Sequence, residues 1–228
     1  MAEIFDTYSE AYEAQVERSI AFSGLGHDFF LAAKVEALGR LLAEALPGVR
    51  PAILDVGCGV GRLHPLIAPL ADRLVGVDPS GESLARARRD HPGLDYRLGS
   101  GERLPVGTGE FDIAVATCAI HHVPPALWPA VAAEMRRAVR PGGFVVLIEH
   151  NPYNPGTRLA VARCPFDADA VLLSARRARA LLRGAGLAGT ASRHILLLPS
   201  AAAPARRLER ALEHAPLGAQ YLAWGRAP

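Results

Sequence analysis

The sequence predicts an α/β protein built on a doubly wound, mostly parallel β-sheet with helices on both faces. Three observations support this fold class. Short apolar runs alternate with amphipathic helical runs between about residues 52 and 149, which is the rhythm of repeated strand–helix units. Closely spaced glycines follow the first apolar run, and an aspartate ends the second. A chain of 228 residues with 50% hydrophobic content can bury one substantial core, so we expect a single domain over residues 1–228.

The elements follow from these patterns in order along the chain. Apolar residues at i, i+3, i+4 spacing predict helices from Glu3 to about Leu46, and Pro47-Gly48 ends them. Right-handed crossovers between parallel strands would then place the loops that leave the strands along one edge of the sheet. The alternating region predicts strands at 52–57, 73–78, 94–98, 111–117 and 143–149, and helices at about 62–70, 80–90 and 125–140.

The last third of the chain is less regular. Residues 151–165 are rich in Asn, Pro and Gly and predict a loop at the carboxyl end of the preceding strand. Such loops often contact substrates. A helix at 174–184 and strands near 190–198 and 218–225 complete the expected elements.

Composition and charge exclude several classes of partner. The formal net charge is only +2 and no dense run of Lys or Arg occurs, so we expect no nucleic-acid partner. The N-terminus shows no secretory signal and no apolar run reaches membrane-spanning length. The three cysteines, Cys58, Cys118 and Cys164, are an odd number without C-x-x-C spacing, which argues against disulfides or a zinc site. We expect a cytoplasmic protein, and the sequence leaves its oligomeric state open.

The most informative segment is Ile53–Gly61, in which Gly57, Gly59 and Gly61 stand at alternate positions directly behind an apolar strand. Glycines in such a turn let the backbone approach a ligand closely, and we expect the following helix to present free N–H groups there. Asp78, at the end of the next strand, can hold ribose hydroxyls. The dinucleotide pattern is G-x-G-x-x-G, and Arg62 occupies the place of its third glycine. A nucleotide-dependent oxidoreductase is therefore the disfavoured alternative.

This loop resembles motif I of the class I S-adenosylmethionine (SAM) dependent methyltransferases, in particular the small-molecule enzymes of the methyltransferase-11 or ubiquinone-biosynthesis-like type. Three more stretches resemble motifs of that family: Gly99–Pro105 followed by Phe111-Asp112, Thr117–Val123, and Arg140–Gly143. The resemblance covers about Ala52 to Glu149. It implies a Rossmann-like sheet of seven strands in which the last strand inserts antiparallel at the sheet edge. It also implies a helical lid over 1–47, a SAM-binding core over 52–150, and a substrate loop and C-terminal sheet edge over 151–228.

The resemblance also implies where the cofactor binds. The glycine-rich loop would face the methionine part of SAM, and Asp78 would grip the ribose. Ser100 stands where the family commonly has an Asp that bonds the adenine amino group, so this contact falls to Ser100, to the backbone around Gly101, or to Glu102. The full set of expected cofactor-binding residues is Asp55, Gly57, Cys58, Gly59, Gly61, Asp78, Pro79, Ser100, Gly101, Glu102, Thr117 and Cys118.

Methyl transfer from a sulfonium is an in-line displacement, so the protein positions the reactants, excludes water and, for some acceptors, removes a proton. His150 is the first candidate for a general base because imidazole titrates near neutral pH. His122, Glu149 and His27 are alternates. A competing interpretation is that His150 and Glu149 are polar groups that only hold the loop closed.

We expect no metal ion. The adjacent His121 and His122 suggest one only superficially, because neighbouring side chains on a strand or loop point apart and no third ligand has an obvious spacing.

Aromatic residues in the N-terminal helices favour an apolar, closed pocket that suits a small or partly hydrophobic acceptor, such as a natural-product or sugar-like intermediate. The sequence does not indicate whether an oxygen, nitrogen, carbon or sulfur atom of the acceptor receives the methyl group. A SAM- or SAH-binding subunit without activity is a further alternative, whereas methylation of RNA or protein would call for a basic rim.

Overall fold

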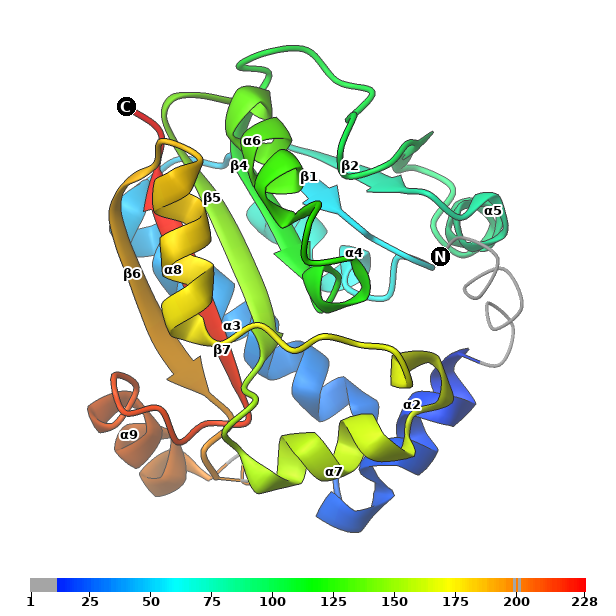
Figure 1. Cartoon of the computed structure of the whole chain (residues 1–228), viewed down its shortest axis with the longest axis vertical. Coiled ribbons are helices and arrows are strands. Elements are labelled where there is room, and N and C mark those ends of the chain that lie inside the picture. Colours follow the sequence, from blue (N-terminus) through cyan, green and yellow to red (C-terminus); the bar gives the residue numbers. More distant parts are fainter. Residues whose placement is uncertain (1–11, 199, 201) are drawn as a thin grey trace.

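The computed structural model describes residues 12–198, 200 and 202–228. Seven strands form one sheet in the order β3-β2-β1-β4-β5-β7-β6 (Figure 1). Strand β7 is antiparallel to both of its neighbours, and the other strands run in one direction. The predicted Rossmann-like fold is thereby confirmed. The strands are β1 (Ala52–Val56), β2 (Arg73–Asp78), β3 (Asp95–Leu98), β4 (Phe111–Thr117), β5 (Val139–His150), β6 (Ala188–Ile195) and β7 (Gln220–Arg226).

The antiparallel strand does not lie at the sheet edge, so that part of the prediction is wrong. β7 pairs with β5 on one side and with β6 on the other, and β6 forms the edge. Burial explains this order: Tyr221, Leu222 and Ala223 are at most 2% exposed, and backbone buried to that degree needs hydrogen-bonding neighbours on both sides. Most residues of β6 are only partly buried, which suits an edge strand.

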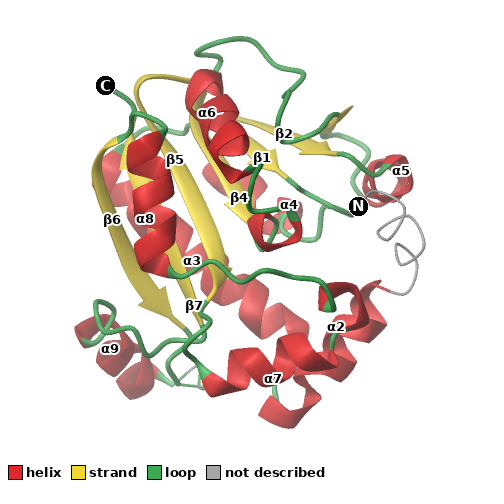
Figure 2. Ribbon diagram, in the orientation of Figure 1, coloured by secondary structure: helices red, strands yellow, loops and turns green. Residues whose placement is uncertain are grey.

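Each face of the sheet is covered by its own set of helices (Figure 2). On β4, Ile113 and Val115 belong to one buried cluster while Ala114 and Ala116 belong to the other, as expected from the two-residue period of a strand. The first cluster contains residues of α3 (His27–Ala45) and α4 (His64–Ile67), and the second contains residues of α6 (Trp128–Ala138) and α8 (Ala175–Gly184). α5 (Gly81–Asp90) packs beside β2 and β3.

Proline changes two of the predicted segments in opposite ways. The helix expected at 62–70 is reduced to α4, with Pro65 in its first turn, and a 3-10 turn over Ala68–Leu70. Pro69 has no N–H to continue α4. The loop expected at 151–165 instead contains α7 (Pro155–Arg163). There Asn154 caps the helix by accepting from the Thr157 N–H, and Pro155 opens its first turn. The same residue types that favour loops thus start a helix when they stand at its first positions.

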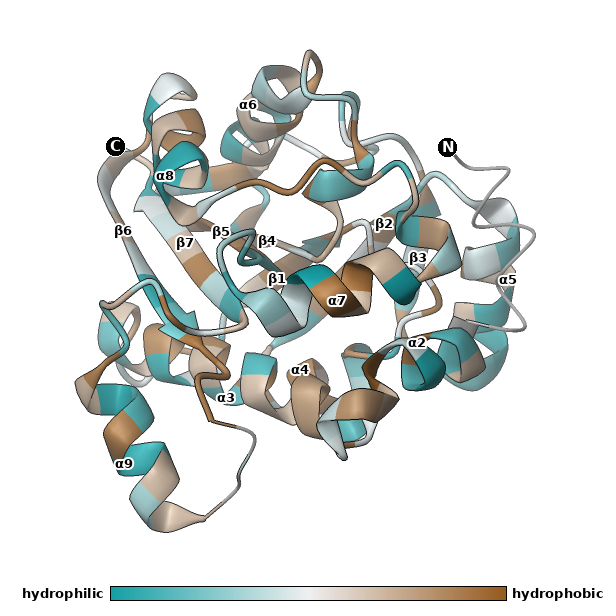
Figure 3. Cartoon of the chain, turned by 60° about the horizontal axis from the view of Figure 1, so that its bottom comes forward, coloured by the Kyte–Doolittle hydropathy of each residue, from teal (hydrophilic) through white to brown (hydrophobic). Residues whose placement is uncertain are grey.

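A helical cover lies at the carboxyl ends of the strands. It is formed by α2 (Tyr12–Ile20), the following 3-10 turn Ala21–Ser23, and α7, with α2 and α7 side by side in Figures 1 and 3. Part of α7 is apolar, as its brown segment in Figure 3 shows. The expected helical lid is therefore present in its described part, and residues 1–11 lie outside the described residues.

The sequence analysis did not predict α9 (Ala203–Ala211). Within the described residues, no helix is both long and apolar enough to cross a membrane.

Candidate active site

A cavity of 740 Å³ opens between the helical cover and the loops that leave β1, β2 and β4. Its size falls in the range of small-molecule sites. Every predicted cofactor-binding residue except Gly61 lines this cavity, as do three of the four candidate bases, His150, His122 and His27. Residues from most of the motifs identified in the sequence therefore line the same cavity.

The three glycines after β1 all adopt left-handed backbone angles, but for different reasons. A Cβ on Gly57 would lie 2.5 Å from the Cβ of Ala119, and one on Gly61 would lie 2.7 Å from the Tyr96 hydroxyl. A Cβ on Gly59 would meet nothing within 4 Å, and Gly59 lines the cavity. Gly57 and Gly61 therefore permit close packing, whereas Gly59 leaves room for a ligand against the backbone.

Substituting Gly57 by alanine should destabilise the fold more than a left-handed angle alone explains. We expect Gly57→Ala to lower the free energy of unfolding by about 2 to 5 kcal/mol, from left-handed strain plus overpacking against Ala119. Gly48 is the matched control, because its φ of +74° is similar and a Cβ there would meet nothing within 4 Å. Gly48→Ala should cost about 1 to 2 kcal/mol. Equal losses in urea unfolding of the two variants would show that the Ala119 contact is not tight.

Asp55 is held by a chain of buried side chains. Its Oδ2 lies 3.0 Å from His64 Nε2, and His64 Nδ1 lies 2.8 Å from the Tyr96 hydroxyl. Burial raises the pKa of Tyr96, so its hydroxyl stays protonated and can donate to His64. Asp55 Oδ1 is buried without a hydrogen-bond partner among the described residues, and the residue lines the cavity. An N–H group of a bound ligand would satisfy this oxygen.

Asp78 combines a structural role with exposure to the cavity. Its Oδ2 accepts from the Gly59 N–H at 2.8 Å and its Oδ1 from the Ser80 N–H at 2.9 Å. Asp78 also lines the cavity, so its carboxylate is placed where it can accept hydrogen bonds from ligand hydroxyls. Ser80, two residues further on, caps α5 by accepting from the Ser83 N–H.

The expected adenine contacts also lie in the cavity wall. Ser100, Gly101 and Glu102 all line it, and the Val131 methyl groups would lie 3.2 Å from a Cβ on Gly101. Val131 lines the cavity too, so an apolar surface stands beside these polar groups. Thr117 Oγ1 is a further buried oxygen without a partner in the described part of the chain.

Lys34 is a functional candidate that the sequence analysis missed. It is the only lysine of the sequence, is 6% exposed, and lines the cavity. No ion pair or hydrogen bond joins it to any other described residue. The spacing along the sequence could have indicated that Lys34 is buried. Lys34 follows Leu31 by three residues and precedes Leu38 by four, which places it on the buried face of α3.

The charge of Lys34 affects the groups around it. Burial, the Lys34 ammonium and the Arg62 guanidinium lower the pKa of His27 to about 4, so His27 is neutral at pH 7. Burial raises the pKa of the Cys118 thiol, but Lys34 and His150 outweigh it and lower the value to about 7. A buried ammonium without an anionic partner favours a ligand that brings an anion.

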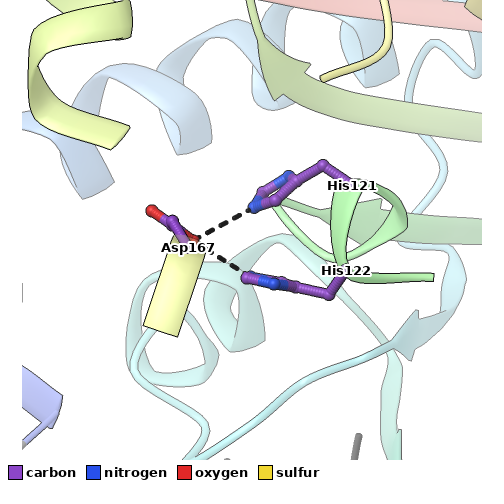
Figure 4. A group of neighbouring side chains, drawn as sticks. All are labelled: His121, His122 and Asp167. Carbon is purple, nitrogen blue, oxygen red and sulfur yellow. Dashed lines mark ion pairs between the residues drawn. The ribbon is translucent and has the colours of Figure 1, made fainter. Parts of the chain in front are cut away.

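The histidines after β4 lie together rather than apart. They belong to a 3-10 turn, Ile120–His122, and their ring centroids are 4.2 Å apart. Both rings point toward Asp167, which belongs to the 3-10 turn Pro165–Asp167 (Figure 4). The expectation that adjacent side chains point apart is therefore wrong, because it assumed a strand or open loop. The missing third group comes from a distant segment that sequence spacing does not show.

Glu149 is fully buried below this cluster and does not line the cavity. Its Oε1 accepts from the N–H groups of Ala119 and Ile120, and its Oε2 lies 2.6 Å from His121 Nδ1. Burial raises the pKa of Glu149, but the charge and hydrogen bond of His121 outweigh burial, so the pKa lies below its usual value. The structure does not support Glu149 as a base that contacts substrate. It is a positioning residue that orients the histidine turn.

The two histidines of the turn differ in charge. Burial lowers the pKa of His121, but Glu149 and Asp167 raise it to about 10. Burial and the His121 charge lower the pKa of His122 to about 4. At neutral pH, His121 therefore carries a proton between two carboxylates, and His122 is a neutral but weakly basic imidazole.

His150 ends β5 and lines the same cavity. Its Nδ1 lies 3.2 Å from Gln220 Nε2, while Gln220 Oε1 is buried without a partner among the described residues. A half-turn of the amide would present Oε1 to Nδ1, because the two ends of an amide group have nearly the same shape. His150 Nδ1–H would then donate to Gln220, and Nε2 would keep its lone pair as a base requires.

Fold and cavity together define an α/β protein with a nucleoside-cofactor site at the carboxyl ends of its central strands. Comparison with known proteins identifies the family within this class. A family model described as a methyltransferase domain matches residues 54–147. An uncharacterised methyltransferase from Synechocystis sp. is 33% identical over 158 residues, which cover 68% of this chain and 71% of the relative. The chain belongs to the class I SAM-dependent methyltransferases, and SAM is its cofactor.

More distant relatives agree with this assignment. A ubiquinone biosynthesis O-methyltransferase from Rhizobium etli is 32% identical over 124 residues, covering 52% of this chain and 48% of that protein. The crystal structure of a Thermotoga maritima SAM-dependent methyltransferase, described as a possible histamine N-methyltransferase, superposes with a TM-score of 0.73 over 100% of both chains at 21% identity. The latter similarity shows the fold. The alternative of a nucleotide-dependent oxidoreductase is thereby set aside.

Proposed function

We propose that this enzyme transfers the methyl group of SAM to a small, partly apolar acceptor that binds in the same cavity as the cofactor. The continuity of the cavity is the main support, since its wall includes the glycine-rich loop and Asp78 on one side and residues of α2 and α7 on the other. In this proposal the whole chain acts as one domain. Residues 52–150 hold the cofactor, and the N-terminal helices and residues 151–228 enclose the acceptor.

The unpaired polar atoms suggest how SAM lies. Its adenosine would place the ribose hydroxyls at Asp78 and the base near Ser100, Gly101 and Glu102. The methionine ammonium would satisfy Asp55 Oδ1, and the methionine carboxylate would pair with Lys34. Both interactions would match a charged ligand group to a protein group of opposite charge. Asp55 Oδ1 is buried without a partner among the described residues, and Lys34 is 6% exposed and lines the cavity.

The Lys34 assignment predicts a loss of cofactor affinity. We expect Lys34→Met to raise the Kd of SAH about 10- to 100-fold, because hydrogen bonds to charged groups contribute about 1.5–3 kcal/mol. Lys34→Arg should keep most of the affinity, since the positive charge remains. Titration calorimetry with SAH measures both variants. An unchanged Kd in Lys34→Met would mean that Lys34 does not contact the cofactor.

For an acceptor that must lose a proton, we propose His150 as the base. It lines the cavity, and Gln220 can fix the tautomer that leaves Nε2 free to accept. His122 and His27 are less suited, because their lowered pKa values make them weaker bases. SAM supplies the electrophilic methyl group, while the protein places the acceptor atom in line with the bond that breaks.

The acceptor side of the cavity is aromatic. Phe22, Phe29, Phe30 and Phe166 all line it, and such surfaces favour ring-bearing or otherwise apolar groups. Relatives named demethylmenaquinone methyltransferase and ubiquinone biosynthesis O-methyltransferase are consistent with a small-molecule acceptor, such as a natural-product or sugar-like intermediate. A methyl-transfer screen with isotopically labelled SAM against fractionated small metabolites tests this. Labelling confined to RNA or protein fractions would contradict it.

We also propose a reducing, cytoplasmic setting without nucleic-acid or membrane partners. A net charge of +2 supports this, as do three free cysteines in the described structure.

A further inference from the structure

Three metal-ligating side chains converge on one point of the cavity wall. They are His121, His122 and Asp167, and all three line the cavity. One ligand atom from each lies within 4.8 Å of the others. Figure 4 shows both imidazoles directed at the carboxylate of Asp167, which belongs to the 3-10 turn Pro165–Asp167.

The spacing of these atoms suits a shared cation better than direct hydrogen bonds. Asp167 Oδ1 lies 3.6 Å from His121 Nε2 and 3.4 Å from His122 Nε2. Charge-assisted hydrogen bonds between nitrogen and oxygen are about 2.7–2.9 Å long. Ligands bound tetrahedrally to Zn²⁺ at about 2.0–2.2 Å stand roughly 3.3–3.6 Å apart. The separations from Asp167 Oδ1 to both histidine nitrogens fall in this range, and one ligand atom of each residue lies within 4.8 Å of the others.

The surroundings of His121 resemble the outer shell of a metal centre. Its Nδ1 is bonded to Glu149 Oε2, and the other Glu149 oxygen is held by two backbone N–H groups. Metal-binding histidines usually donate their second N–H to a carboxylate in this way, which fixes the ring and makes the metal-facing nitrogen more basic.

The donor set indicates which metals would bind. Two imidazoles and one carboxylate favour Zn²⁺, Fe²⁺ or another first-row transition ion over Mg²⁺ and Ca²⁺, which prefer oxygen ligands. Three protein ligands leave at least one coordination position open. Since all three residues border the cavity, and the His150 ring stands 5.0 Å from that of His121, the open position faces the space assigned to the acceptor.

We propose that His121, His122 and Asp167 bind a divalent transition-metal ion whose open coordination position holds an oxygen atom of the acceptor. The metal site follows from the geometry alone, while the occupant of the open position rests on the proposed function. Such an ion would orient the acceptor oxygen toward the methyl group and would explain why the histidine turn is built over a buried glutamate.

Cobalt titration of the full-length, chelator-treated protein tests the metal site. Tetrahedral Co²⁺ has characteristic visible absorption, and we expect saturable binding of one equivalent that Zn²⁺ displaces. Asp167→Asn and, independently, His122→Gln should weaken Co²⁺ binding at least tenfold. Asp169→Asn is the matched control, because Asp169 is exposed and lies two residues away. Absence of saturable binding, or equal affinity in wild type and both ligand variants, would overturn the site.

Two further readouts separate this proposal from the proposed function. Azide added to the cobalt protein should shift the visible spectrum if a coordination position is open to the cavity, and an unchanged spectrum would refute that position. SAH titration of the same samples is independent of the metal. Wild-type protein that binds Co²⁺ but not SAH would contradict the proposed function and leave the metal site intact. Protein that binds SAH but not Co²⁺ would contradict the metal site and leave the proposed function intact.

Discussion

Replacing Asp78 by asparagine is expected to weaken SAH binding about 10- to 100-fold. The carboxylate already accepts the Gly59 and Ser80 N–H groups, and it is the one acidic group placed to accept hydrogen bonds from both ribose hydroxyls in the proposed pose. Hydrogen bonds to a charged acceptor contribute about 1.5–3 kcal/mol, and each 1.4 kcal/mol changes a Kd tenfold. Asparagine is preferred to alanine because it keeps the volume and one acceptor oxygen for the loop.

Asp72→Asn is the control for this variant. Asp72 is exposed and stands just before the amino end of β2, whereas Asp78 ends the same strand. Calorimetric titration with SAH should give a wild-type Kd for Asp72→Asn. If Asp78→Asn binds SAH as tightly as wild type while its thermal stability is reduced, Asp78 serves only to hold the loop and the cap of α5.

Replacing His150 by glutamine is expected to lower kcat about 10²- to 10⁴-fold for an acceptor that must be deprotonated, which is the range attributed to general-base catalysis. The Kd of SAH should change less than twofold, because no cofactor group is assigned to His150. Glutamine retains hydrogen bonding to Gln220 but cannot accept a proton at neutral pH. Single-turnover rates with the acceptor found by the screen, together with SAH titration, separate the two effects.

His214→Gln is the matched control, because His214 does not line the cavity. A second variant, Gln220→Leu, removes the amide that fixes the His150 tautomer and should lower kcat by a smaller factor. A His150→Gln enzyme with kcat within twofold of wild type would show that His150 only helps to close the loop after β5, which was the competing interpretation from the sequence.

The cofactor side of the cavity could be predicted from sequence because its chemistry lies where strands end. Gly59 lies three residues after β1, and Asp78 is the last residue of β2. Parallel strands bring their carboxyl ends to one edge of the sheet. The local sequence pattern of strands and turns is therefore enough to predict that Gly59 and Asp78 belong to one site. Gly61 differs, because its left-handed angle serves packing against Tyr96, and sequence alone does not distinguish a glycine that faces a ligand from one that faces a side chain.

The acceptor side depended on contacts between distant segments. Asp167 lies beside His121 because α7 and the 3-10 turn after it bring the chain back to the cavity wall, and the Asn154-Pro155 start of α7 has residue types that favour a loop. Lys34 was overlooked because a charged residue on a helix is usually solvated, and its burial follows from the packing of α3 on the sheet. Glu149 was expected to act in catalysis, but its burial under the histidine turn became visible only in three dimensions.

The measurement that tests the central claim most directly is a crystal structure of the enzyme with SAH. We expect the ribose hydroxyls within hydrogen-bonding distance of Asp78, the amino-acid end between Asp55 and Lys34, and the sulfur facing the space bordered by His150 and the histidine turn. A sulfur atom that faces solvent or a closed wall, or SAH bound outside this cavity, would contradict the account.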